Sequence, residues 1–200
     1  MTTTQRTDAR LNRERLLATA REVFAEAGPG ASLNEIASRA GVGPGTLYRH
    51  FPNRTALLAA VLRDRIEALC AHAEDLLASE SADEALAQWL RAFLAHARVS
   101  QGIGSALMVG SAGELGLDCH RRILGAAAGL LTRAQRQGTA RTDLTADDLL
   151  QLVIGIALST ARPEDAGQPD RLLALVLDAT QAVPRRSAPL PDVVRSSGAR

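Results

Sequence analysis

Apolar residues recur at intervals of three and four along almost the whole chain, and this spacing constrains the fold more than any other feature. It places apolar side chains on one face of an α-helix, because the helix completes a turn every 3.6 residues. Alternating runs of β-branched residues, which are typical of strands, are scarce. The sequence therefore predicts an all-α protein. Helices are expected over residues 11–27, 33–40, 44–50, 54–78, 81–97, 117–137, 145–161 and 170–183, while residues 101–116 are the least predictable segment.

The most informative local pattern is a pair of short helices separated by a tight turn, within residues 32–51. The run Ser32-Leu33-Asn34-Glu35 matches a capping box, in which a Ser hydroxyl and a Glu side chain satisfy free backbone donors. Gly41 follows the first helix, where a residue without Cβ tolerates the left-handed conformation. Pro44 suits the first position of the second helix, because no helical partner is lost with its N–H. Together these features predict a helix-turn-helix, whose second helix enters the major groove of DNA.

The outer face of that second helix carries side chains suited to phosphates and base edges, namely Thr46, Tyr48, Arg49 and His50. Arg54 begins the following helix, where free backbone N–H groups also attract phosphate. Residues 1–65 contain ten Arg and six acidic residues, whereas residues 66–200 contain thirteen Arg and sixteen acidic residues. A basic N-terminal segment joined to a mildly acidic remainder is consistent with nucleic-acid binding.

Residues 33–54, LNEIASRAGVGPGTLYRHFPNR, resemble the signature of the tetracycline-repressor (TetR) family. The shared features are I-A-x-x-A-G-V, G-T-L-Y-x-H-F and a basic residue three positions after Phe51, followed by the apolar pair Leu57-Leu58. The resemblance covers about residues 11–65, and the remainder is similar to the family only in being helical. It implies a sequence-specific transcriptional regulator that binds double-stranded operator DNA as a homodimer. It further implies a repressor that an unknown small-molecule effector releases from the operator.

The same resemblance implies which side chains contact DNA. Tyr48 and His50 would bind chiefly phosphates, although Tyr48 is alternatively a packing residue. Many relatives have a long polar side chain, which often reaches a base, where this chain has Pro44. Base reading here would then fall to Thr46, Arg49 or Arg39, which the sequence does not rank. The full set of expected DNA contacts is Ser32, Arg39, Thr46, Tyr48, Arg49, His50 and Arg54.

The chain is expected to contain four segments. Residues 1–10 form a flexible arm, residues 11–65 the DNA-binding domain, and residues 66–183 a helical ligand-binding and dimerisation domain. Residues 184–200 are rich in Pro, Ser and Arg and are predicted to be a disordered tail.

Six residues of the C-terminal domain are candidates for a ligand pocket: Trp89, Phe93, His96, Gln101, Met108 and His120. Trp89, Phe93 and His96 share one helical face by their spacing, although a core position is the stronger interpretation for the two aromatic residues. The sequence contains no pattern typical of a metal site, a phosphate loop or a nucleophile–base pair. We therefore expect no metal, no cofactor and no enzymatic activity.

Apolar residues wrap most of the circumference of the last two helices, although a surface helix needs only one apolar stripe. A second apolar face requires a second burial surface, which the resemblance implies is a four-helix dimer interface. The alternative is a fully buried core helix. The residues expected at the interface are Leu149, Val153, Ile156, Leu172 and Val176.

Cysteine content and hydropathy together predict a cytoplasmic protein without a membrane partner. Two cysteines are too few for a disulfide framework, which favours a reducing compartment. The polar N-terminus lacks the apolar segment of a secretory signal. The longest uncharged stretches, residues 99–113 and 149–161, are shorter than the roughly 20 residues of a membrane span.

Overall fold

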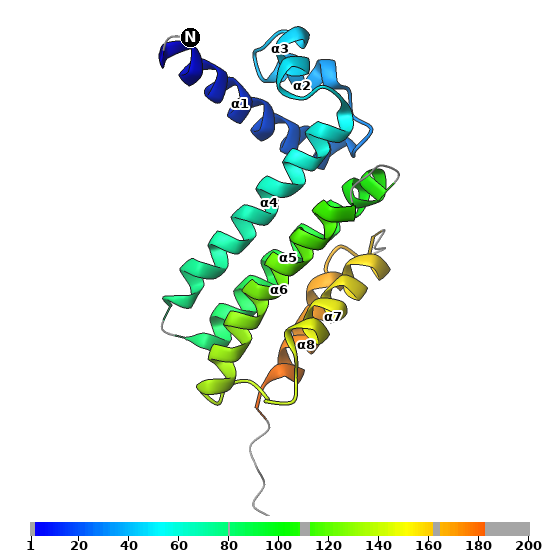
Figure 1. The fold of residues 1–200 in the computed structure, drawn as a ribbon. Coiled ribbons are helices and arrows are strands. Elements are labelled where there is room, and N and C mark those ends of the chain that lie inside the picture. Colours follow the sequence, from blue (N-terminus) through cyan, green and yellow to red (C-terminus); the bar gives the residue numbers. More distant parts are fainter. Residues whose placement is uncertain (1–2, 80, 109–112, 162–164, 183–200) are drawn as a thin grey trace, which may run out of the picture.

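The computed structural model describes residues 3–79, 81–108, 113–161 and 165–182, with side chains described for all of these except residues 3–6, 101–108 and 113–117. These ranges form eight helices and one isolated antiparallel bridge, between Ala140 and Gln181. The predicted all-α fold is therefore confirmed (Figure 1). The helices are α1 (Thr3–Ala27), α2 (Leu33–Arg39), α3 (Pro44–His50), α4 (Arg54–Leu77), α5 (Ala82–Met108), α6 (Gly113–Arg136), α7 (Ala146–Ser159) and α8 (Gln168–Thr180).

The N-terminal helices α1, α2 and α3 pack with the first turns of α4 around one apolar core. Each helix contributes at least one side chain with no exposed surface: Leu16, Ile36, Leu47 and Leu57. Burying one such side chain stabilises the fold by roughly 1.5–3 kcal/mol. The shared core therefore holds α2 and α3 in a fixed arrangement on α1 and α4.

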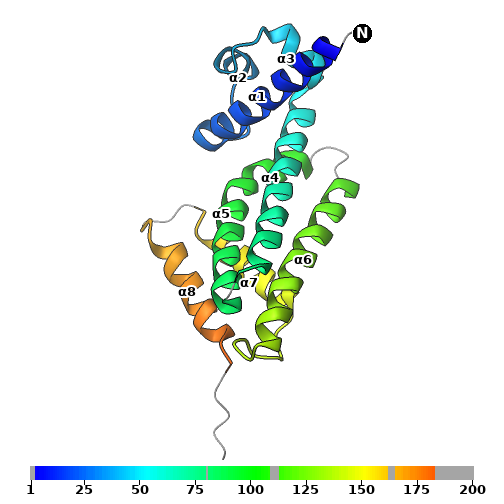
Figure 2. The same cartoon turned by 90° about the vertical axis from the view of Figure 1, so that its left-hand side faces the viewer.

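The C-terminal helices form a second core, which α4 enters at Ile66 after leaving the first core at Val61. Helices α5 and α6 pack on α4, and α7 and α8 lie beyond them on the side away from α4 (Figures 1 and 2). Trp89 of α5 has no exposed surface, and its Nε1 donates a hydrogen bond to the carbonyl of Leu69 at 3.0 Å. Helix α4 is thus one continuous helix that contributes to both cores.

Three helices extend further than the sequence predicts. Helix α1 begins at Thr3 and so includes residues 3–10 of the expected arm, which contain no Gly or Pro to stop a helix. Helices α5 and α6 include most of residues 101–116, although they contain four glycines of this segment and each Gly inside a helix costs up to about 1 kcal/mol. The predicted tail, residues 184–200, lies outside the described residues. Within the described ranges, no helix has the length and apolarity needed to cross a membrane.

Candidate nucleic-acid interface

Helices α2 and α3 are joined by the tight turn that the sequence predicts. The Ser32 hydroxyl caps α2 by accepting a hydrogen bond from the backbone N–H of Glu35 at 3.4 Å. Gly41 adopts φ of +70°, which turns the chain out of α2, and Gly43 precedes α3 in an extended conformation. Pro44 occupies the start of α3. The helix-turn-helix expected over residues 32–51 is thereby confirmed.

Replacing Gly41 with Ala should destabilise the protein by about 1–2 kcal/mol, because a Cβ is disfavoured in the left-handed region. The space around Gly41 is open, so this cost comes from the backbone alone. Gly30→Ala is the matched control, since Gly30 is exposed and also has open space but is not in the left-handed region. We expect it to change the unfolding free energy by no more than about 0.5 kcal/mol. Urea unfolding measured by circular dichroism compares the two, and equal costs would contradict this account of the turn.

Arg39, an expected DNA contact, is held by two carboxylates of its own domain. Its guanidinium lies 2.7 Å from Glu26 of α1 and 2.8 Å from Glu35 of α2. The hydrogen bond with Glu26 and the charges of both carboxylates raise the pKa of Arg39 above its usual value. Glu35 therefore pairs with Arg39 and does not return to the α2 N-terminus, so only the Ser32 half of the predicted capping box forms.

Helix α3, which carries four of the expected contacts, lies at the end of the molecule farthest from the C-terminal helices (Figure 1). Leu47 is fully buried against the domain core, whereas Tyr48, the next residue, is 48% exposed. Tyr48 therefore projects outward, and the alternative of a packing role is not supported. Arg49 is exposed, with its Nε donating to the carbonyl of Gly45 at 3.2 Å, and Thr46 and His50 are half-buried.

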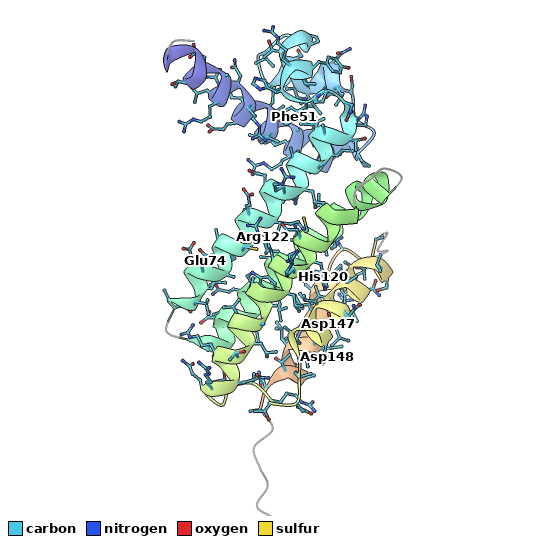
Figure 3. All side chains as sticks on the ribbon, viewed as in Figure 1. Phe51, Glu74, His120, Arg122, Asp147 and Asp148 are labelled. Carbon is cyan, nitrogen blue, oxygen red and sulfur yellow. The ribbon has the colours of Figure 1, made fainter. Side chains whose placement is uncertain are left out.

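Arg54 has a structural role that the sequence did not reveal. Its Nη1 donates hydrogen bonds to the carbonyls of Pro29, at 3.0 Å, and Ala31, in the loop between α1 and α2. Nearby, the guanidinium of Arg13 lies 5.5 Å from the ring centre of Phe51, which is buried within the N-terminal domain (Figure 3). These arginines fix the loop and α1 against the start of α4. A phosphate contact by Arg54 remains a prediction.

The described candidates for the ligand pocket do not form one wall. Trp89 and Phe93 are 0% and 3% exposed and stack with ring centroids 5.5 Å apart, so in this structure both belong to the core, as in the alternative interpretation of the sequence. His120 is exposed on α6 (Figure 3). His96 alone lines a cleft, which lies between α1, α4 and α5. The side chains of Gln101 and Met108 lie outside the described residues.

Three of the expected interface residues face the core of their own protomer. Leu149 and Val153 have no exposed surface and Ile156 is 8% exposed, because this side of α7 packs against α5 and α6. They are unavailable to a partner subunit, so their interface assignment is wrong. Leu172 and Val176 of α8 are half-buried. The large apolar side chains that α7 and α8 do expose are Leu152, Leu158 and Leu175, at 50%, 61% and 65%.

Comparison with known proteins connects this geometry to one family. Residues 16–61 match the family model described as bacterial regulatory proteins of the tetR family. Residues 81–179 match the model described as the C-terminal domain of SbtR-like transcriptional regulators. Among curated proteins, the chain is 40% identical over 72 residues to the HTH-type transcriptional regulator UidR of Escherichia coli, covering 35% of this chain and 37% of UidR. A Staphylococcus aureus HTH-type regulator is 35% identical over 80 residues, 38% of this chain and 41% of that protein, so these alignments span well under half of each relative.

The solved structures resemble the chain over most of its length. A TetR transcription regulatory protein from Mycobacterium vanbaalenii is 34% identical, with a TM-score of 0.70 over 88% of this chain and 99% of that chain. A TetR transcriptional regulator from Streptomyces coelicolor is 37% identical, with a TM-score of 0.75 over 86% of this chain and 99% of that chain. Because this identity extends through both cores, the chain belongs to the TetR family of DNA-binding transcriptional regulators, which are not enzymes.

Proposed function

We propose that the protein is a homodimeric, cytoplasmic repressor that binds a near-palindromic operator and leaves it when a small molecule binds. The observation that carries the DNA contact is the outward face of α3. There, Tyr48 is 48% exposed beside the fully buried Leu47, so one residue anchors the helix and the next faces solvent. An exposed Tyr next to Arg49 provides donors for phosphate oxygens on a helix narrow enough for the major groove.

Helices α7 and α8 are the proposed contact between the two copies. They lie on the side of the bundle away from α4 and leave the N-terminal domain free (Figure 2). Leu152, Leu158 and Leu175 are exposed on these two helices, and burying them between two copies would remove their apolar surface from water. A two-fold dimer built there presents one α3 from each subunit to one of two half-sites.

Release from DNA would pass through α4, which runs from one core into the other. A ligand that binds one arrangement of the C-terminal helices better than another shifts the population of the dimer. The tilt of α4 sets the position of α3, so the separation of the two α3 helices changes with it. A dimer whose α3 helices no longer match the half-site spacing loses one set of contacts.

Operator binding by Tyr48→Ala tests the proposed interface. Mapping of bound genomic fragments first gives the operator, and fluorescence anisotropy then measures affinity at several salt concentrations. We expect about tenfold weaker binding from the lost contacts, with the dimer intact. Leu77→Ala, an exposed residue at the far end of α4, is the control and should bind as the wild type does. Unchanged affinity of the Tyr48 variant, or equal affinity of the wild type for every duplex at moderate salt, would contradict the proposal.

A further inference from the structure

A cleft of about 580 Å³ lies where the N-terminal domain meets the C-terminal helices. Arg21 and Glu22 of α1, Arg65 and His72 of α4, and His96 of α5 provide its polar lining. Alanine and leucine side chains from the same three helices provide the rest. Its volume is within the range of small-molecule sites. The cleft thus joins one helix of the DNA-binding domain to two helices of the C-terminal domain.

Arg65 is a cation without a counter-ion in this cleft. It is half-buried and forms no ion pair with any residue in the described parts of the chain. Arg21, by contrast, lies 2.9 Å from the carboxylate of Asp64. Burial and the nearby charge of Arg21 lower the pKa of Arg65, which shows that its surroundings disfavour the positive charge. A partly desolvated guanidinium of this kind is destabilising unless an anion accompanies it.

His96 lines the same cleft and carries a buried ring nitrogen without a partner among the described residues. The side chain is 9% exposed, its Nε2 lies 3.4 Å from the hydroxyl of Ser100, and its buried Nδ1 has no hydrogen-bond partner among the described residues. Burial, together with the charge of Arg65, lowers the pKa of His96 to about 4, so the ring is neutral at neutral pH. When Nε2 accepts from Ser100, the ring proton sits on Nδ1, where no described residue accepts it.

We propose that this cleft binds a small carboxylic acid anion with an aliphatic body, whose carboxylate lies between the Arg65 guanidinium and Nδ1 of His96. The charge of Arg65 selects an anion, because a charge-assisted hydrogen bond is about twice as strong as a neutral one. The alanine-lined walls select a ligand with an apolar body over an inorganic ion. Glu22, the one acidic residue in the described lining, disfavours a polyanion.

The position of the cleft gives the bound acid a means to control DNA binding. Its carboxylate would be held by α4 and α5, while its body contacts α1 next to Ala25. Occupancy would therefore fix the angle of the DNA-binding domain on the C-terminal helices. This consequence rests on the proposed repressor function, whereas the binding of the acid does not.

Titration calorimetry of the full chain without DNA tests the site, with octanoate, its neutral analogue octanamide and inorganic phosphate as probes. We expect octanoate to bind, with Arg65→Gln weakening it about tenfold or more. Arg63→Gln, an exposed arginine two residues earlier on α4, is the matched control and should change the affinity less than about twofold. Ala68→Phe, which fills the cleft from an exposed position, should also abolish binding and leaves the charges unchanged.

Four results would each overturn the site. Octanamide or phosphate could bind as tightly as octanoate, the Arg65→Gln variant could bind octanoate as the wild type does, or octanoate could give no heat. Operator affinity at saturating octanoate is measured separately. A change of affinity that Arg65→Gln removes supports control of DNA binding through this cleft. Octanoate binding through Arg65 with unchanged operator affinity supports the site and overturns that control. Failure of the unliganded protein to select an operator overturns the repressor function and leaves the calorimetric result standing.

Discussion

Leu175→Arg is expected to give a folded monomer that binds the operator about 100-fold or more weakly than the wild type. Leu175 is 65% exposed on α8, so a long charged side chain fits there without disturbing the protomer. In the proposed dimer, the same arginine would be buried at the interface without a counter-ion, which is strongly destabilising. Loss of the dimer also removes the effective concentration that links the two half-site contacts, a factor of about 10²–10⁴.

Light scattering after size-exclusion chromatography gives the mass of this variant, and anisotropy with the operator duplex gives its affinity. Leu77→Arg is the control, because Leu77 is a similarly exposed leucine, at 41%, on α4. It should remain dimeric. Val153→Arg is not a suitable interface variant, since Val153 has no exposed surface and the substitution would disrupt the protomer core. A dimeric Leu175→Arg protein would place the interface elsewhere on the molecule.

The sequence does not predict which of the two apolar faces of α7 is buried in the protomer. Periodicity correctly indicates that this helix is apolar on more than one side, but it does not say which side faces the protomer core. Val153 and Leu152 are adjacent in the sequence, yet the first is fully buried and the second is 50% exposed. Only the packing of α7 on α5 and α6, which no local pattern encodes, decides between them.

Local signals, by contrast, predicted the helix-turn-helix well. The Ser32 cap, the positive φ of Gly41 and the position of Pro44 each depend on a few neighbouring residues, so their chemistry is readable in the sequence. Contacts between residues that are far apart in the sequence cannot be predicted in this way. Arg133 of α6, for example, donates hydrogen bonds to the carbonyls of Leu76 and Ser79 at the end of α4. Nothing near residue 133 in the sequence indicates that partner.

Two of the residues predicted for the ligand pocket, Trp89 and Phe93, lie in the core for a related reason. Trp89, Phe93 and His96 do share a helical face, as their spacing indicates, and Phe93 and His96 have ring centroids 6.4 Å apart. That face points into the helical bundle, so Trp89 and Phe93 are buried in the core. His96 reaches the cleft only because α5 passes close to α1 and α4 at that point.

Acidification should destabilise the protein through His96. The pKa of this residue falls from 6.5 in the unfolded chain to about 4 in the folded protein, chiefly by burial and then by the charge of Arg65. Between these two values the unfolded chain binds a proton that the folded protein does not bind. The free energy of unfolding therefore rises with pH across this window. The contribution of the neutral His96 to this free energy is lost as the pH falls from about 6.5 toward 4.

The cost of keeping His96 neutral reaches about 3 kcal/mol at pH 4. His96→Gln removes the titrating group, so between pH 7 and pH 4 the wild type should lose about 3 kcal/mol more unfolding free energy than this variant. His120→Gln is the matched control, because His120 is exposed and its loss should leave the wild-type pH dependence unchanged. Urea unfolding at a fixed protein concentration across this pH range gives all three curves. Parallel curves for the wild type and His96→Gln would contradict this prediction. They would mean that the imidazole is hydrated or paired in solution. The low pKa of His96 requires a ring that is buried near the charge of Arg65 and has no carboxylate partner.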